Sequence, residues 1–139
     1  MKKLSILILA VLFSFAVNLG DASAGKVTPS HVYQTAANIV GDLNKIRVAG
    51  GGTAVAMKSG ASGKSPGDVY DAGARLVGVL GGSAGAKPGG KITPVHVMDI
   101  LNKAHGLVKT KGATNTAFVD GKSPSDVYDA VETAIAAAK

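Results

Sequence analysis

Lys64-Ser65-Pro66-Gly67-Asp68-Val69-Tyr70-Asp71-Ala72 returns further along the chain as Lys122-Ser123-Pro124-Ser125-Asp126-Val127-Tyr128-Asp129-Ala130. Two looser versions of the same start are Thr28-Pro29-Ser30-His31-Val32-Tyr33 and Thr93-Pro94-Val95-His96-Val97-Met98. Four segments therefore open with a hydroxyl residue followed by proline. Because a threonine type and a serine type alternate twice along the chain, the pattern indicates an internal duplication.

The hydroxyl-proline pairs predict four helix starts. A serine or threonine side chain caps the first N–H groups of a helix, and proline is favoured at the first helical position because no N–H is lost there. In the serine-type starts an aspartate stands three residues after the cap, where it can accept from the cap N–H and meets the positive end of the helix dipole. The predicted structural helix caps are Thr28, Ser65, Asp68, Thr93, Ser123 and Asp126.

The residues after each start have the apolar periodicity of amphipathic helices. Val32, Ala36, Ile39, Leu43 and Ile46 follow a four-three spacing, and the other three segments carry similar stripes. No segment has a long strand pattern. The sequence therefore predicts an all-α fold, a small antiparallel four-helix bundle built from two tandem helix-loop-helix repeats. Repeat one is 27–83, repeat two is 92–139, and a glycine-rich link covers 81–91.

The connections inside the two repeats have apolar centres at residues 53–57 and 116–119. We expect these loops to cover the end of the bundle or to pair as a short two-stranded ribbon, with a ligand-contacting lid as the alternative. The interval from Thr28 to Ser65 is 37 residues, whereas that from Thr93 to Ser123 is 30. The first half therefore has room for one extra heptad in its first helix.

The first residues have the pattern of a cleaved signal peptide. Lys2 and Lys3 precede an apolar run, Leu4 to Val17, that is short for a bilayer span of ~20 residues, and Ala22-Ser23-Ala24 supplies small residues for cleavage. We expect residues 1–24 to be removed and residues 25–139 to form a single helical domain, with an uncleaved anchor as the alternative. The protein is then periplasmic or secreted, without a transmembrane span in the mature chain.

Composition narrows the class of protein further. The chain has no cysteine, so it is neither a disulfide scaffold nor a lipoprotein, and packing and helix-end hydrogen bonds must hold the fold. Removing Lys2, Lys3 and Asp21 with the signal changes 15 basic and 9 acidic residues to 13 and 8, a net charge of +5. Because the lysines are scattered and tryptophan is absent, nucleic-acid binding is not expected, whereas weak contact with an anionic membrane surface stays open.

His31 and His96 hold the third position of the two threonine-type helices, and both helix starts fall at one end of the expected bundle. Each imidazole can accept from the N–H of its own cap residue, Thr28 or Thr93, or the two rings can share a metal ion. Both interpretations need a neutral ring, because the helix dipole opposes a charged one here. Two histidines without a cysteine supply only half of a typical zinc site.

Other motif fragments lack the context that their chemistry needs. Gly63-Lys64-Ser65 and its copy end like a phosphate-binding loop, but the first glycine of that motif is missing. Gly81-Gly82-Ser83-Ala84-Gly85 lies after a helix, not on a strand-to-helix turn. The three tyrosines, Tyr33, Tyr70 and Tyr128, fit the edge of a core, and Asp71 and Asp129 fit dipole complements. We therefore predict no enzyme activity, no catalytic residue and no cofactor.

These inferences favour an exported, non-enzymatic binding or protein-interaction module of the bacterial envelope or exterior, whose partner the sequence does not identify. Two alternatives stay open. One is a metal or small-ligand carrier that uses the His31/His96 end, and it predicts a metal-induced thermal shift that needs both histidines. The other is a cationic protein of the envelope surface, which predicts salt-sensitive binding to anionic vesicles.

Overall fold

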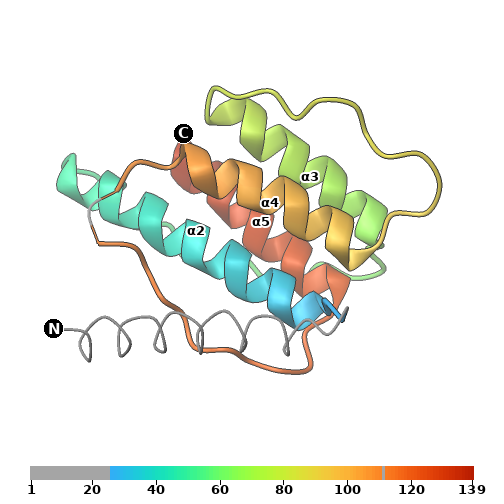
Figure 1. Ribbon diagram of the computed structural model, residues 1–139. Coiled ribbons are helices and arrows are strands. Elements are labelled where there is room, and N and C mark those ends of the chain that lie inside the picture. Colours follow the sequence, from blue (N-terminus) through green and yellow to red (C-terminus); the bar gives the residue numbers. More distant parts are fainter. Residues whose placement is uncertain (1–25, 111) are drawn as a thin grey trace, which may run out of the picture.

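The computed structural model describes residues 26–110 and 112–139. In these ranges the chain forms four α-helices and no strand (Figure 1): α2 (Pro29–Ala49), α3 (Pro66–Val79), α4 (Pro94–Leu107) and α5 (Pro124–Ala138). The predicted all-helical fold is confirmed, and every helix begins at a proline that follows threonine or serine. Within the described ranges no helix is long and apolar enough to cross a membrane. The predicted signal peptide, residues 1–24, lies outside the described residues.

The predicted antiparallel arrangement is wrong. The first residues of the helices, Pro29, Pro66, Pro94 and Pro124, lie together around one apolar depression. Figure 1 shows all four helices running from that end of the bundle to the other. The bundle is therefore parallel. The depression has a volume of ≈ 10 Å³, which is room for about one water molecule and too little for a ligand.

The connections explain why the helices can be parallel. Antiparallel neighbours in a bundle are joined by short loops, whereas residues 50–65, 80–93 and 108–123 separate consecutive helices here. A helix of 14 residues, such as α3, is about 21 Å long, and an extended segment with as many residues spans about twice that distance. Each connection can therefore return beside the bundle and begin the next helix at the same end.

Helices that follow each other in sequence are not always neighbours in space. α2 packs against α5 and α4, and α3 packs against the same two helices, so the order around the bundle is α2, α5, α3, α4. α2 and α3 are diagonally opposite, as are α4 and α5. Each half of the chain thus supplies one diagonal pair. The connection within each pair passes along a helix of the other half, residues 58–64 along α5 and residues 114–122 along α2.

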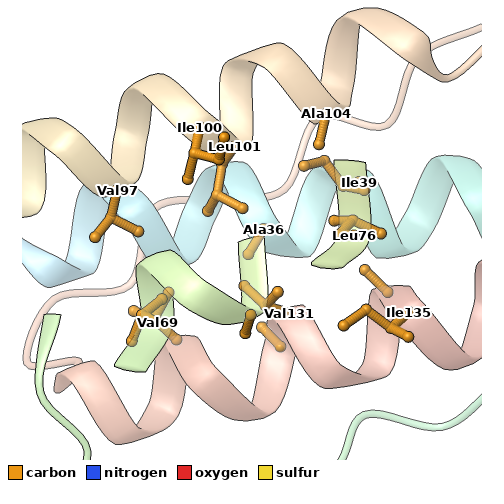
Figure 2. Packing of buried hydrophobic residues seen from close by; sticks show 14 of the residues in the cluster. Ala36, Ile39, Val69, Leu76, Val97, Ile100, Leu101, Ala104, Val131 and Ile135 are labelled. Atoms are coloured by element: carbon orange, nitrogen blue, oxygen red, sulfur yellow. The ribbon is translucent and has the colours of Figure 1, made fainter. Parts of the chain in front are cut away.

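The core alternates large and small side chains. Ile39, Leu76 and Leu101 are 0 % exposed, and buried alanines lie among them (Figure 2). A Cβ atom on Gly73 would lie 2.8 Å from Ile100 Cγ2, so the bare backbone of α3 lets α4 approach closely. This packing offsets the loss of about 1 kcal/mol that glycine brings to a helix interior relative to alanine.

α2 is longer than the other helices. It has 21 residues against 14 in α4, so the first half contains a further heptad of helix. Because all four helices begin at one end, this extra length projects beyond the far end of the bundle by about 10 Å. Figure 1 shows the projection at the left. We call residues 43–49 the α2 overhang.

Spin labels can test the parallel arrangement, because the chain contains no cysteine. Gly67 and Val95 are the second helical residues of neighbouring helices, and labels on Gly67→Cys/Val95→Cys should lie about 10–20 Å apart. The control Gly67→Cys/Gly106→Cys places its labels near opposite ends and adds most of a helix length, about 20 Å along the axis. Double electron–electron resonance measures both pairs. A longer distance for the first pair than for the control would show that α3 and α4 are antiparallel.

Candidate functional site

The helix starts form one end of the bundle. Ser65 and Ser123 accept from the N–H groups of Asp68 and Asp126, whose carboxylates accept from the serine N–H groups at 2.9 and 2.8 Å. These backbone hydrogen bonds are the main reason why the pKa of Asp68 and that of Asp126 lie below the usual value. Four parallel helices place four positive dipole ends here, and the two carboxylates offset part of that charge.

Replacing Asp126 with alanine removes the carboxylate that accepts from the Ser123 N–H. We expect this change to lower the free energy of unfolding by about 1 kcal/mol. Circular-dichroism melts of the two proteins measure the loss, with Asp99→Ala, at an exposed position of α4, as the control. A melting temperature equal to that of the wild type would contradict the role of this cap.

His31 and His96 stand where α3 and α5 have the capping aspartates. Nδ1 of His31 accepts from the Thr28 N–H at 3.1 Å, and Nδ1 of His96 accepts from the Thr93 N–H at 3.0 Å. The ring of His31 also lies 5.0 Å, between centroids, from that of Phe118. A metal ion shared by the histidines would therefore have to use Nε2. In the described part of the chain, no three histidine, aspartate or glutamate side chains are grouped so that they could hold a metal ion.

The lysines of the repeated Lys-Ser-Pro motif dock on neighbouring helices. Lys64 donates its backbone N–H to the Ser125 hydroxyl on α5 at 3.0 Å, and its Nζ lies 4.3 Å from the centre of the Tyr128 ring. Lys122 makes the same two contacts with α2: its N–H donates to the Ser30 hydroxyl at 2.9 Å, and its Nζ lies 4.4 Å from the centre of the Tyr33 ring. These cation–π contacts make Tyr33 and Tyr128 fixing points for the connections, whereas Tyr70 is buried in the core.

The connection between α4 and α5 lies along α2 and is held by its side chains. Asn38 accepts from the Thr116 N–H at 2.7 Å, and Gln34 donates to the Thr116 carbonyl at 2.7 Å. The α2 residues that contact this connection are Ser30, Gln34, Asn38, Asp42 and Lys45. A spacing of three or four residues places them on one flank of the helix. An extended segment is thus paired with side chains and not with a strand.

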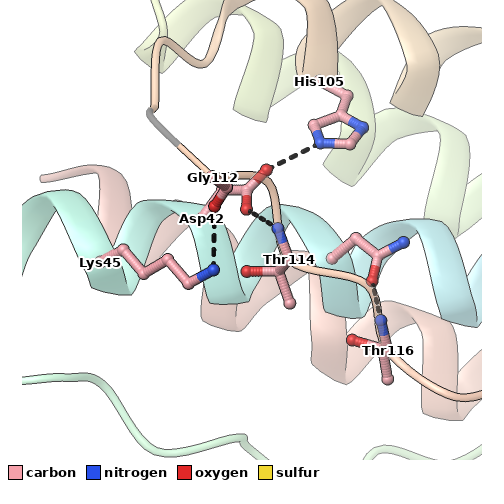
Figure 3. Close-up of polar contacts among 7 residues, drawn as sticks. Asp42, Lys45, His105, Gly112, Thr114 and Thr116 are labelled. Atoms are coloured by element: carbon pink, nitrogen blue, oxygen red, sulfur yellow. Dashed lines mark hydrogen bonds and ion pairs between the residues drawn. The ribbon is translucent and has the colours of Figure 1, made fainter.

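The buried end of this flank is the candidate site. Asp42 is 1 % exposed, and its Oδ2 lies 2.9 Å from Nε2 of His105 on α4. Its Oδ1 accepts from the Thr114 N–H, so the carboxylate joins α2, the end of α4 and the following connection (Figure 3). A Cβ atom on Gly41 would lie 2.6 Å from the Thr114 side chain, so only glycine at this position lets the connection approach.

The electrostatics of this site favour an ionised Asp42. Burial acts to raise the pKa of its carboxyl, but the hydrogen bonds from His105 and from the Thr114 N–H outweigh burial, and the pKa lies below the usual value. His105 therefore donates from Nε2 to a carboxylate. Both carboxylate oxygens already accept from the protein, which is the arrangement of a structural clamp. The Thr114 hydroxyl is buried and has no hydrogen-bond partner among the described residues.

The sequence patterns do not predict this clamp. Asp42 and His105 are 63 residues apart, and no short motif links them. A usable signal is the run of polar residues at 30, 34, 38 and 42, which follows the helical period beside the apolar stripe of the same helix.

The α2 overhang leaves apolar side chains in water. Ile46 is 41 % exposed and Val48 is 54 % exposed, although Ile46 continues the apolar stripe of α2. The stripe has no neighbouring helix to face at this height, because the other helices have ended. Lys45 precedes Ile46 and Arg47 lies between Ile46 and Val48, and residues 43–49 include no acidic residue.

Hydrogen bonds from the next connection hold the overhang in place. Asn44 accepts from the Val55 N–H at 2.8 Å and donates to the Val55 carbonyl at 3.0 Å. Nε of Arg47 donates to the Thr53 carbonyl at 2.9 Å. Val55 in turn packs against the edge of the core. The last turns of α2 are thus fixed without being covered.

The apolar connections behave differently from the prediction. In the described residues they form no ribbon, because residues 58–64 lie along α5 and residues 114–122 lie along α2. Val55 packs on the core, whereas Met57, Phe118 and Val119 are 40, 46 and 48 % exposed. Burial over the bundle end is therefore wrong for most of these side chains.

Comparison of the chain with protein-family models, curated protein sequences and solved structures gives no match. The functional argument therefore depends on the geometry described above.

Proposed function

We propose that this protein is an exported, non-enzymatic binding module of the bacterial envelope or exterior, and that the α2 overhang is its contact surface for a protein partner. The observation that carries the proposal is the projection of α2 beyond its bundle with Ile46 and Val48 exposed. A helix end without a core beneath it lacks the packing that stabilises most helices. The hydrogen bonds of Asn44 and Arg47 supply a substitute, as expected for a surface that is kept in shape for a partner.

The charge of the overhang indicates the character of the partner. Lys45 and Arg47 are basic, and residues 43–49 include no carboxylate. These cations complement the negative end of the α2 dipole, and they favour a partner surface that surrounds an apolar contact with acidic groups.

Two observations support the remaining parts of the proposal. Export rests on the charged, apolar and small-residue order of residues 1–24, and it predicts that the mature protein begins at Gly25, which N-terminal sequencing measures. The non-enzymatic assignment rests on Asp42, whose two oxygens are both engaged within the fold.

We also propose that residues 27–83 and 92–139 are copies of one helix-connection-helix unit. Each half contributes a diagonal pair of helices, and a quarter turn about the bundle axis brings α2 to the place of α4 and α3 to that of α5. The matching caps support the same relation, with threonine and histidine in one pair and serine and aspartate in the other.

Photo-crosslinking in the native host tests the contact surface. A benzoylphenylalanine at Val48 should give a discrete crosslinked species, whereas the same probe at Ser83, exposed on the α3–α4 connection, should not. Ile46→Glu in the Val48 probe protein should remove the species, because a charge replaces an apolar contact. No species from position 48, or an identical species from position 83, would refute the overhang as the contact surface.

A further inference from the structure

The outer flanks of α5 and α2 each hold an extended segment of the chain. On α5, hydroxyl or carboxylate oxygens at four-residue spacing accept from backbone N–H groups of the α2–α3 connection. The accepting residues are Ser125, Asp129 and Thr133, at 3.0, 3.1 and 2.9 Å. On α2 the flank that begins at Ser30 does the same for residues 114–122. The bundle thus uses one mode of recognition twice, an extended backbone laid along a polar helix flank.

The sixth residue of each helix marks this flank. Gln34, Asp71 and Asp129 are the sixth residues of α2, α3 and α5, and each contacts an extended segment. Asp99 is the sixth residue of α4. It is exposed, and it makes no hydrogen bond or ion pair with any residue in the described ranges.

α3 is the closest template for the flank of α4. Its second residue is Gly67, so it lacks the hydroxyl of Ser30 and Ser125, and it holds its connection through the Asp71 carboxylate, 2.9 Å from Lys87 Nζ. α4 likewise has no hydroxyl at the second position, where Val95 is 44 % exposed. Asp99 has no partner in the described part of the chain and lies one turn from the exposed Val95, so this flank is complementary to an extended segment that carries a lysine and an apolar residue.

Two of the three connections between the described helices pack on helices other than α4. Residues 58–64 lie on α5 and residues 112–122 lie on α2. The α3–α4 connection pairs with α3 through Lys87. Among the described residues its one hydrogen bond to an α4 side chain comes from Lys103, whose Nζ donates to the Ala84 carbonyl at 3.2 Å, and Gly82 lies against Leu107 at the end of α4. We therefore propose that the flank formed by Val95 and Asp99 binds an extended, lysine-bearing segment of a partner protein. This site is distinct from the α2 overhang and does not depend on it.

A peptide with the sequence of residues 80–92 is a suitable probe, because its Lys87 already pairs with an aspartate in this position of a helix. In a titration of ¹⁵N-labelled protein we expect shifts of the amide signals of residues 95–103. Asp99→Asn should weaken peptide binding about two- to fivefold, as for an exposed ion pair, and a glutamine in place of Lys87 in the peptide should do the same. Asp99→Lys should abolish binding, because the flank then repels the lysine.

Val48→Ser is the matched control, since it alters the overhang and should leave peptide binding unchanged. Amide spectra of the free variants show whether each is folded. Absence of shifts on α4, shifts confined to α3 around Asp71, or equal binding by wild type and Asp99→Lys would each overturn the proposal. A crosslinking failure at Val48 would bear only on the overhang.

Discussion

Replacement of Leu101 with alanine is expected to lower the free energy of unfolding by about 2–5 kcal/mol, the largest effect that we predict for one substitution. Leu101 is 0 % exposed, and its Cδ2 would lie 3.5 Å from a Cβ atom on Gly73. Deleting its side chain leaves a cavity beside Gly73, in a core that consists mostly of alanine and β-branched residues. Such side chains have few alternative rotamers with which to fill the space, so the cavity should persist and the loss should lie toward the upper part of this range.

Urea unfolding followed by circular dichroism measures the loss. Val95→Ala is the control on the same helix, because Val95 is 44 % exposed and its truncation should change stability by less than about 0.5 kcal/mol. Equal losses for the two variants would mean that Leu101 is not buried in the core that the four helices share.

Local features of this fold could be predicted from the sequence because their partners are close in the chain. Each cap joins residues three apart, as Ser65 and Asp68 show, and the following apolar stripe needs only the helical period. The same locality explains why the Thr28 cap was one of the two interpretations of His31 that the sequence offered, beside a shared metal ion.

The direction of the helices is not a local property. Caps and stripes are the same in a parallel and an antiparallel bundle, and the choice depends on where each connection lies. Here the connections carry their own partners, such as Lys64 on Tyr128 and Lys122 on Tyr33, which lie far apart in sequence. The lengths of the connections were the one available signal, since short loops would have been expected for antiparallel neighbours.

The exposed surfaces follow from the same arrangement. Ile46 fits the apolar stripe of α2 and was expected in the core, but α2 is a heptad longer than α4 and the parallel arrangement leaves its last turns without neighbours. Asp99 is exposed for a related reason, because the described connections pair mainly with α5, α3 and α2. Both proposed contact surfaces are thus consequences of the topology, which a sequence pattern does not contain.

The Asp42–His105 clamp should make a pH-dependent contribution to the free energy of unfolding. At neutral pH, His105→Ala leaves a buried carboxylate with one donor fewer, and we expect a loss of about 1–3 kcal/mol. Asp42→Asn should lower the free energy of unfolding by a similar amount. The carboxylate accepts through both oxygens, whereas a carboxamide has one oxygen that accepts and one NH2 group that can only donate, so one of the two contacts with His105 and the Thr114 N–H is lost. If the two residues act as a pair, the double variant should lose less than the sum of the single losses.

Acid should remove the difference between wild type and Asp42→Asn. The pKa of Asp42 is lowered in the folded protein, so its stabilisation is fully present above the unfolded-state pKa of about 3.9 and is lost as the pH falls through the lower folded value. Urea unfolding at pH 7 and near pH 3 should therefore show a stability difference that narrows in acid. Asp99→Asn, at an exposed position with no ion pair among the described residues, should stay close to wild type at both pH values. A difference that is constant or grows at the lower pH would mean that Asp42 is not ionised in the fold. In that case the neutral α2 side chains Ser30, Gln34 and Asn38 would hold the connection between α4 and α5.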